Sequence, residues 1–271
     1  MAEVREGTVC VFGVGGPMGS SIIGPLAELY TLRLADIMSE AQVRERPLMK
    51  GAPPHPRLDS PHEWVQVDVT DYDQVDRAVE GCDAVINITV NRVCRPAAFR
   101  VNLGGTWNIL RASARHGAKR VITTGPVNVE GMDFEGDYRY EFDVDEDAPF
   151  RAGAGLYPLT KHLSYEAADA FAREHDLDVM TLLVSRLRPH DAFDNRDGNV
   201  VIPFSTAWED LASAFIAALR APRMERPNER FFVCADLPMG KYRAGKAKRL
   251  LGWEAKHTFE SFTRRSRRLG E

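Results

Sequence analysis

The chain of 271 residues lacks the features that would direct it to a membrane, to nucleic acid or to a disulfide scaffold. No apolar run approaches the roughly 18 residues of a membrane-spanning helix, and the first residues lack the apolar core of a signal peptide. The formal net charge of −4 gives no basic surface for nucleic acid. Cys10, Cys82, Cys94 and Cys234 form no C-x-x-C pair, so we expect reduced thiols and a cytoplasmic protein without nucleic-acid or membrane partners.

What the chain does contain is the composition of an ordinary globular protein, with 44% hydrophobic and 27% charged residues. Its length favours a single domain, residues 1–271, without internal repeats. Short apolar strands alternate with helical patterns, which predicts an α/β fold with a doubly wound parallel sheet. The expected strands are 8–12, 32–36, 65–69, 84–89, 120–124, 178–184 and 231–235, and the expected helices are 22–29, 71–80, 97–116, 156–173, 207–219 and 242–251.

Two passages between these elements are interpreted as irregular. The proline-rich segment 38–61 is expected to be a surface loop, and the acidic segment 125–155 a solvated lid near the site. Asp143, Asp145 and Asp147 form a D-x-D-x-D pattern within the second segment. A calcium loop would need glycine at its sixth position and glutamate at its twelfth, where this chain has alanines. We therefore predict no metal.

The first strand runs directly into a glycine cluster, Gly13-x-x-Gly16-x-x-Gly19, that is followed by a helical run. In a dinucleotide-binding turn, the glycines form the tight turn, admit a pyrophosphate and let the helix pack closely on the strand. The phosphates then lie at the helix N-terminus, where free N–H groups and the helix dipole favour negative charge. The pattern alone is common, and the next strand supplies a second signal.

That second strand ends in Asp36, about 20 residues beyond the first glycines, where an acidic side chain can bind the adenosine ribose hydroxyls. A carboxylate there repels the 2′-phosphate of NADP, so the sequence predicts NAD as cofactor. Arg33 is the nearby cation, and the alternation of side chains along a strand places it on the face opposite Asp36.

Tyr157 and Lys161 stand at i and i+4 near the start of a predicted helix, so both side chains can reach one ligand. An ammonium beside a phenol stabilises the phenolate and lowers a pKa that starts near 10. Tyr157 is therefore expected to accept a proton during catalysis.

With these motifs in place, the chain resembles the short-chain dehydrogenase/reductase superfamily in its extended, sugar-epimerase-like branch, and within it the uronate dehydrogenases. The residues that carry the resemblance to the superfamily are Gly13–Gly19, Asp36, Asp68-Val69, Asn102 with Gly105, Thr106 and Asn108, Tyr157 with Lys161, and Leu250–Trp253. The stretches Leu32–Ile37 and Ser205–Trp208 carry the resemblance to the uronate dehydrogenases. The resemblance implies a Rossmann fold, with substrate-binding elements from about 186–206 and 222–271. It also implies a homodimer through the helices that begin near Ala97 and carry Tyr157, where Ile109, Leu110 and Phe171 are taken as surplus apolar residues.

The resemblance assigns roles to individual positions. The implied NAD-binding residues are Gly13, Gly16, Pro17, Met18, Gly19, Asp36, Asp68, Val69, Asn87, Ile88, Asn102 and Lys161. The catalytic residues are Tyr157, Lys161 and Thr124, and the substrate-binding residues are Asn91, Asn128 and Arg186, with Arg92 and Arg188 as further candidates for a substrate carboxylate.

One position departs from the superfamily, which has a serine or threonine after the fifth strand. Counting back from the glycine of the following turn leads to Pro126, which has neither a hydroxyl nor an N–H group. Three explanations remain: Thr124 substitutes, Asn128 polarises the substrate, or catalysis is impaired.

These observations favour an NAD-dependent oxidoreductase acting on a hydroxyl of a small sugar, uronic acid or related polyol. One alternative is an NAD-dependent epimerase or dehydratase, which uses the same cofactor transiently and releases no NADH. The other is a non-catalytic dinucleotide-binding protein, which Pro126 supports and the Tyr157–Lys161 pair opposes.

Overall fold

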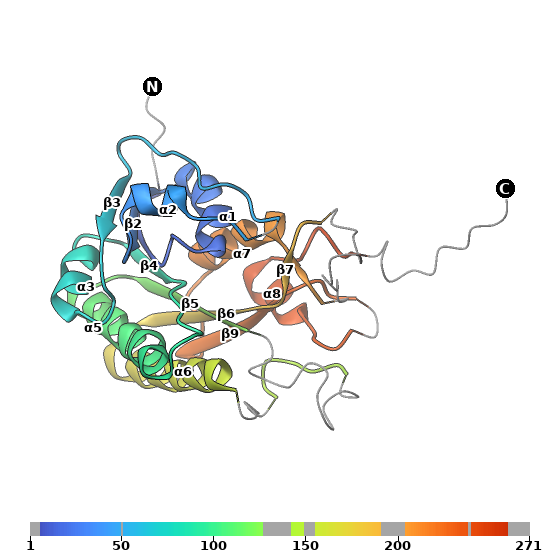
Figure 1. Cartoon of the computed structure of the whole chain (residues 1–271). Helices are drawn as coiled ribbons and strands as arrows, with labels where there is room; N and C mark the ends of the chain where they lie inside the picture. Colours follow the sequence, from blue (N-terminus) through green and yellow to red (C-terminus); the bar gives the residue numbers. More distant parts are fainter. Residues whose placement is uncertain are drawn as a thin grey trace, which may run out of the picture.

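A parallel β-sheet covered by helices on both faces forms the body of the protein (Figure 1). The computed structural model describes residues 6–49, 51–126, 142–148, 155–190, 204–237 and 240–259. Within these residues the main sheet has seven strands in the order β3-β2-β1-β4-β5-β6-β9. The strands are β1 (Thr8–Phe12), β2 (Thr31–Asp36), β3 (Glu63–Gln66), β4 (Ala84–Asn87), β5 (Arg120–Pro126), β6 (Asp178–Val184) and β9 (Asn228–Val233). All neighbouring pairs are parallel, which confirms the predicted fold class.

Two hydrophobic cores lie on opposite faces of this sheet. Val9 and Val11 of β1 belong to the core under α1 (Pro17–Ala27) and α7 (Trp208–Arg220). Cys10 and Phe12 belong to the core under α3 (Tyr72–Val79), α5 (Thr106–His116) and α6 (Leu156–His175). This division follows from the alternation of side chains along an extended strand. A two-stranded pair, β7 (Leu187–Arg188) with β8 (Thr206–Ala207), and α8 (Gly245–Leu251) lie outside the main sheet.

The structure confirms two helix predictions that were based on local sequence signals. Asp71 caps α3 by accepting hydrogen bonds from the N–H groups of Asp73 and Gln74 at 3.0 and 3.2 Å. The predicted helix 97–116 is continuous from α4 (Arg95–Ala98) through a π-helical segment (Phe99–Gly105) into α5. The π-helical segment contains Asn102, and such segments frequently occur at functional sites.

Other expectations were wrong in detail. The segment 38–61 contains a helix, α2 (Glu40–Glu45), which begins with a capping box formed by Ser39 and Gln42. Strand β3 occupies Glu63–Gln66 rather than 65–69, because its pairing partner β2 ends at Asp36, opposite Gln66. Of the predicted helix 242–251, only the part from Gly245 is helical.

The segment expected to form a lid lies mostly outside the described residues. Gly125 and Pro126 extend β5, and Glu146 is buried, where it accepts a hydrogen bond from the backbone N–H of Phe232 at 2.8 Å. Val144 and Glu146 are therefore packed against the body of the protein, whereas Phe142, Asp143, Asp145 and Asp147 are exposed, so the described part is solvated only on one side. Among the described residues no cluster of potential metal ligands is found, and no helix is long and apolar enough to cross a membrane.

The apolar residues taken as evidence for a dimer are part of the core. Ile109 and Leu110 are fully buried, and Phe171 is buried beneath the edge of the Trp107 ring, with ring centroids 4.4 Å apart. These three side chains therefore give no reason to expect a partner.

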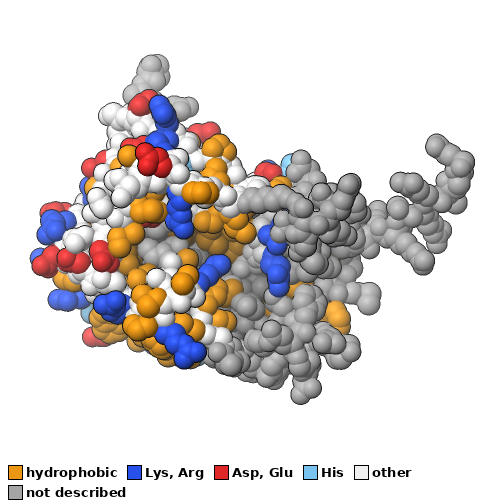
Figure 2. Space-filling model, in the orientation of Figure 1, with side chains coloured by type: hydrophobic (Ala, Val, Ile, Leu, Met, Phe, Trp, Pro, Cys, Tyr) orange, Lys and Arg blue, Asp and Glu red, His pale blue; other side chains and the backbone are white. Residues whose placement is uncertain are grey.

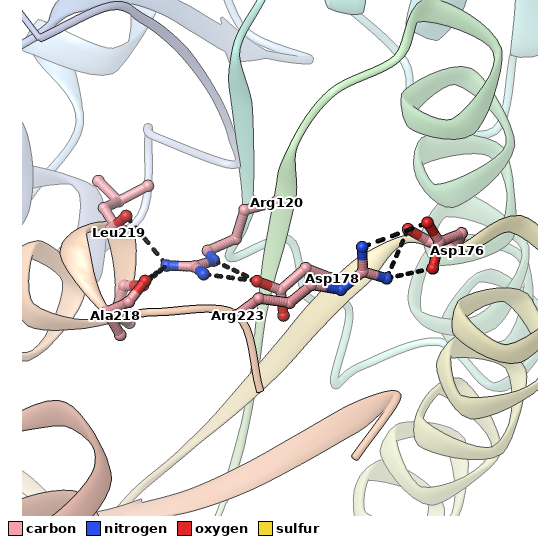
Figure 3. A network of polar contacts seen from close by, with 7 residues as sticks. Arg120, Asp176, Asp178, Ala218, Leu219 and Arg223 are labelled. Atoms are coloured by element: carbon pink, nitrogen blue, oxygen red, sulfur yellow. Dashed lines mark hydrogen bonds and ion pairs between the residues drawn. The ribbon is translucent and has the colours of Figure 1, made fainter. Parts of the chain in front are cut away.

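A buried ion pair joins the first residues of β5 and β6 at the amino edge of the sheet (Figure 3). Arg120 Nε donates to Asp178 Oδ2 at 2.9 Å, and Nη1 donates to the carbonyl groups of Ala218, Leu219 and Ala221 at 2.6, 3.0 and 2.7 Å. These carbonyl groups lie at the C-terminal end of α7, where the last carbonyls of a helix have no N–H donors from the helix itself. One guanidinium therefore joins two strands and a helix.

Arg120→Met is expected to destabilise the protein by about 3–5 kcal/mol, because it leaves a buried carboxylate and three carbonyls without their donor. Arg223→Gln is the matched control, since the Arg223–Asp176 pair beside it is exposed, and we expect a far smaller change. Urea unfolding of both variants measures the difference. Equal unfolding midpoints would show that Arg120 does not hold these elements together.

Candidate active site

The predicted site residues gather at the carboxyl edge of the sheet, where β1 lies between β2 and β4. The chain leaves β1 and β4 in opposite directions across the sheet, and in open α/β sheets such a switch point forms the binding crevice. The loops after β1, β2, β3 and β4 all begin at this edge, because the strands are parallel.

The glycine turn after β1 has the geometry that the sequence predicts. Gly13 has φ +88°, and a Cβ atom there would lie 2.8 Å from the backbone nitrogen of Thr89. A Cβ on Gly19 would lie 2.0 Å from the carbonyl oxygen of Val14, so only glycine lets α1 pack this closely on the turn. Gly16 is the N-cap of α1 and Pro17 is its first residue. The turn therefore brings the N-terminus of α1, where backbone N–H groups can bind a phosphate, to the carboxyl edge of the sheet.

Asp36 lies at the end of β2 against this turn. Its Oδ2 accepts a hydrogen bond from the N–H of Gly15 at 2.7 Å, and its Oδ1 accepts one from the N–H of Met38 at 3.0 Å. Each carboxylate oxygen has a second lone pair available for a ribose hydroxyl. Arg33 is directed elsewhere, as expected, and donates to the carbonyls of Ala78 and Glu80.

The buried amide of Asn102 joins the loop after β4 to α6. Its Oδ1 accepts from the N–H of Asn91 at 2.7 Å, and its Nδ2 donates to the carbonyl of Asn91 and to Thr160 Oγ1, both at 2.9 Å. Asn87 at the end of β4 is also buried, and its Oδ1 accepts from the N–H and the hydroxyl of Thr89 at 3.0 and 2.6 Å. These two amides fix the loop that faces α6.

Tyr157 and Lys161, one turn apart on α6, both reach this loop. Lys161 is buried, and its Nζ donates to the carbonyl of Thr89 at 3.1 Å. The exposed Arg92 lies over the Tyr157 ring, 4.5 Å from the ring centroid, and its Nη2 donates to the phenol oxygen at 3.4 Å. The structure therefore brings a phenol, an amine and a guanidinium together.

The electrostatics of this group differ from the sequence expectation. Burial raises the pKa of Tyr157 above its usual value, and the Arg92 guanidinium opposes that rise. Burial lowers the pKa of Lys161 to about 7, and the charge of Arg92 acts in the same direction. The expected lowering of the Tyr157 pKa by Lys161 is therefore wrong for this structure, in which Arg92 is the cation that acts on the phenol.

The end of β5 is the least expected part of the site. Pro126 is paired in register with Val184 of β6, and Thr124 Oγ1 donates to the carbonyl of Asn87 at 3.4 Å. The residue between them, Gly125, has no side chain. Thr124 stays a prediction for the third catalytic group.

The remaining predicted site residues do not contact Tyr157 or Lys161 through any hydrogen bond found among the described residues. Asp68 and Val69 follow β3, where Asp68 Oδ1 accepts from Thr70 and the carbonyl of Val69 accepts from Asn108. Ile88 is buried beside β1. Arg186 is exposed after β6, and Asn128 lies outside the described residues. The roles implied for these residues stay predictions.

The sequence interpretation missed two contributors. Gly15 supplies the N–H that orients Asp36, and its place in the glycine cluster was the available signal. Thr89 supplies the carbonyl that binds Lys161, and no sequence signal indicates a backbone role of this kind.

A dinucleotide-binding turn, an acidic residue after β2 and a Tyr–Lys pair on α6 define a nucleotide-dependent α/β protein. The model of the NAD dependent epimerase/dehydratase family matches residues 9–206, and the chain belongs to this family. The cofactor of the family is NAD, and the residues present fit it: the glycine turn brings the N-terminus of α1 to the carboxyl edge of the sheet, and Asp36 offers acceptors for ribose hydroxyls.

Individual relatives include enzymes of several kinds. A uronate dehydrogenase from Pseudomonas syringae is 30% identical over 164 residues, which cover 59% of this chain and 56% of that protein. Two solved structures share the fold. One is a glucuronic acid dehydrogenase from Chromohalobacter salexigens, with 19% identity and a TM-score of 0.75 over 95% of this chain and 87% of that one. The other is a UDP-glucose 4-epimerase from Thermotoga maritima, with 17% identity and a TM-score of 0.70 over 94% of this chain and 98% of that one. The chain spans a little over half the length of the curated relatives it matches.

Asp36→Ala is expected to weaken NAD binding by about 10-fold or more, because two charge-assisted hydrogen bonds to ribose hydroxyls are lost. The same change should narrow the preference for NAD over NADP, since the repulsion of a 2′-phosphate disappears as well. Calorimetric titration of both cofactors against the original chain and the variant measures both effects. NADP binding as tightly as NAD to the original chain would contradict the assignment.

Proposed function

We propose that the protein is an NAD-dependent oxidoreductase that oxidises a hydroxyl group of a small sugar acid, with a uronate as the leading substrate. The observation that carries this proposal is the Arg92 guanidinium over the Tyr157 ring. A guanidinium binds a carboxylate through two parallel hydrogen bonds. A substrate carboxylate held by Arg92 would keep the sugar next to the phenol that removes its proton. The relationship to uronate dehydrogenases supports the same substrate class.

The reaction assigns one task to each group. NAD held by the glycine turn and Asp36 would supply the hydride acceptor for the carbon that carries the reacting hydroxyl. Tyr157, as the phenolate, accepts the proton of that hydroxyl, so that the C–O single bond becomes a carbonyl group. Arg92 favours the phenolate by its charge. Lys161 lies within one helical turn of Tyr157 and would hold the nicotinamide ribose.

The direct test is the formation of NADH from NAD with D-glucuronate and D-galacturonate, and with neutral sugars as controls. An epimerase or dehydratase would convert a sugar without releasing NADH, and a binding protein would convert nothing.

Asn91, Asn128 and Arg186 remain proposed substrate contacts, and their alanine variants should raise KM on the substrate found.

Tyr157→Phe is expected to lower kcat by about 10²–10⁴-fold, because the proton acceptor is lost while the ring stays in place. NAD affinity, measured by calorimetry, should remain near that of the original chain. A variant that keeps its turnover would exclude Tyr157 as the base.

Arg92→Met should have two effects that a structural role would not produce together. Loss of a charge-assisted hydrogen-bond pair should raise KM for the uronate by about 10–100-fold. Because Arg92 lowers the pKa of Tyr157, its loss should move the rise of kcat/KM to higher pH. Arg100→Met, which removes an exposed arginine from the π-helical segment, is the control. An unchanged pH profile for Arg92→Met would contradict the assignment.

We also propose a homodimer through α5 and α6. Hydrophobic side chains gather on the surface over these helices (Figure 2), and Phe99, Trp107 and Leu159 are 40%, 48% and 39% exposed. Light scattering at micromolar concentration should give the mass of two chains, and Trp107→Glu should give the mass of one because it places a charge in the apolar contact. A monomeric original chain would contradict the proposal.

A further inference from the structure

The turn that carries Arg92 is exposed to solvent. Arg92, Val93 and Cys94 are all exposed, and for Val93 the exposed fraction is 94%. Buried side chains therefore do not fix this turn. Arg92 nevertheless reaches Tyr157, with its guanidinium 4.5 Å from the ring centroid. A long side chain on an unpacked turn keeps one direction only where hydrogen bonds fix the backbone that carries it, because its conformational entropy opposes that order.

The side-chain oxygen of Asn91 supplies these hydrogen bonds. Asn91 Oδ1 accepts from the N–H of Val93 at 3.2 Å and from the N–H of Cys94 at 3.1 Å. An asparagine that binds the backbone two residues further along forms an Asx turn, which bends the chain tightly. Arg92 is the residue enclosed by this turn. The direction in which its side chain leaves the backbone is therefore set by Asn91.

The backbone of Asn91 is fixed as well. The Asn102 amide binds its N–H and its carbonyl at 2.7 and 2.9 Å. Cys94 is the N-cap of α4 and gives it no side-chain cap, and α4 continues into the π-helical segment that carries Asn102. Asn102 thus holds the backbone of Asn91, and Asn91 holds the start of the helix that leads back to Asn102. Two asparagines close this piece of chain and leave Arg92 at its tip.

The Arg92 guanidinium acts on both functional groups of α6. Burial raises the pKa of Tyr157, and Arg92 opposes the rise by its charge and its hydrogen bond. Burial lowers the pKa of Lys161, and the charge of Arg92 acts in the same direction. Lys161 itself donates to the carbonyl of Thr89. Among the described residues no hydrogen bond joins Asn91 to Tyr157 or Lys161, so its connection to the phenol runs through Arg92.

We propose that Asn91 is a positioning residue for the reaction, whose side-chain oxygen directs Arg92 over the phenol and toward the substrate carboxylate. This inference rests on the proposed function, in which Arg92 binds that carboxylate. The amide nitrogen of Asn91 takes no part in the turn and stays available for the substrate contact proposed above. The two roles therefore belong to different atoms of one side chain, the oxygen for the turn and the nitrogen for a substrate.

Two substitutions separate these roles. Asn91→Ala removes both atoms, whereas Asn91→Ser removes the nitrogen and keeps an oxygen that can accept from the same N–H groups. Asn91→Ala is expected to raise KM for the uronate by about 10-fold and to move the rise of kcat/KM to higher pH, as Arg92→Met does. Asn91→Ser should keep the pH profile of the original chain. Loss of a substrate contact alone changes KM and leaves that profile in place, so an unmoved profile in Asn91→Ala overturns the proposal.

A double-mutant cycle tests whether Asn91 acts through Arg92. In the Arg92→Met background, Asn91→Ala and Asn91→Ser should have the same pH profile, because no guanidinium is left to direct. A further shift caused by Asn91→Ala in this background would contradict the proposed route.

Asp71→Ala is the matched control. Asp71 Oδ1 also accepts from the N–H groups two and three residues further along, those of Asp73 and Gln74, at 3.0 and 3.2 Å, but at the start of α3. This variant should lower the thermal midpoint and leave the pH profile unchanged. A profile that moves equally in Asp71→Ala would show a general effect of losing a turn, and the assignment to Asn91 would fall.

Two measurements need no turnover and keep this proposal separate from the proposed function. Hydrogen exchange of the Val93 and Cys94 amides should be about 10-fold faster in Asn91→Ala than in the original chain, with Asn91→Ser between them. The titration of the Tyr157 phenol, followed by NMR of labelled tyrosine and assigned with Tyr157→Phe, should move to higher pH in Asn91→Ala. Unchanged exchange and titration overturn the role of Asn91 whatever the substrate is. A chain that shows both changes and oxidises no uronate overturns the proposed function and supports Asn91 as the residue that directs Arg92.

Discussion

The site depends on one buried side chain, Asn102, which lies in the π-helical segment between α4 and α5. Its amide binds both backbone groups of Asn91 and the hydroxyl of Thr160, and its own carbonyl accepts from the hydroxyl of Ser164. The loop after β4 is thereby held at a fixed position relative to α6. Arg92 and Tyr157 come from these two segments and meet because of this connection.

Two cations, Arg92 and Lys161, and one phenol, Tyr157, lie close together, so the site is sensitive to small changes in solvation. Burial lowers the pKa of Lys161 to about 7, so its charge depends on what is bound beside it. Arg92 lies exposed at the surface next to the phenol of Tyr157. A bound ribose would add acceptors beside Lys161 and favour its protonated form.

The sequence predicted the parallel sheet, the glycine turn, Asp36 and the Tyr157–Lys161 pair, because each rests on local spacing. It did not predict α2, because the prolines around it hid a six-residue helix whose capping signal, Ser39 to Gln42, is short. The contact of Arg92 with Tyr157 joins residues 65 positions apart, and no spacing rule reaches that far.

The Arg120–Asp178 pair and the candidate active site occupy opposite edges of the same sheet. The amino edge holds a buried charge network that tolerates little change, whereas the carboxyl edge supplies loops whose residues contribute mainly to chemistry. A substitution in these loops can therefore change the chemistry while the Arg120–Asp178 pair still joins β5, β6 and α7. The groups that hold the sheet together and the groups that face a substrate are thus separated by the length of the strands.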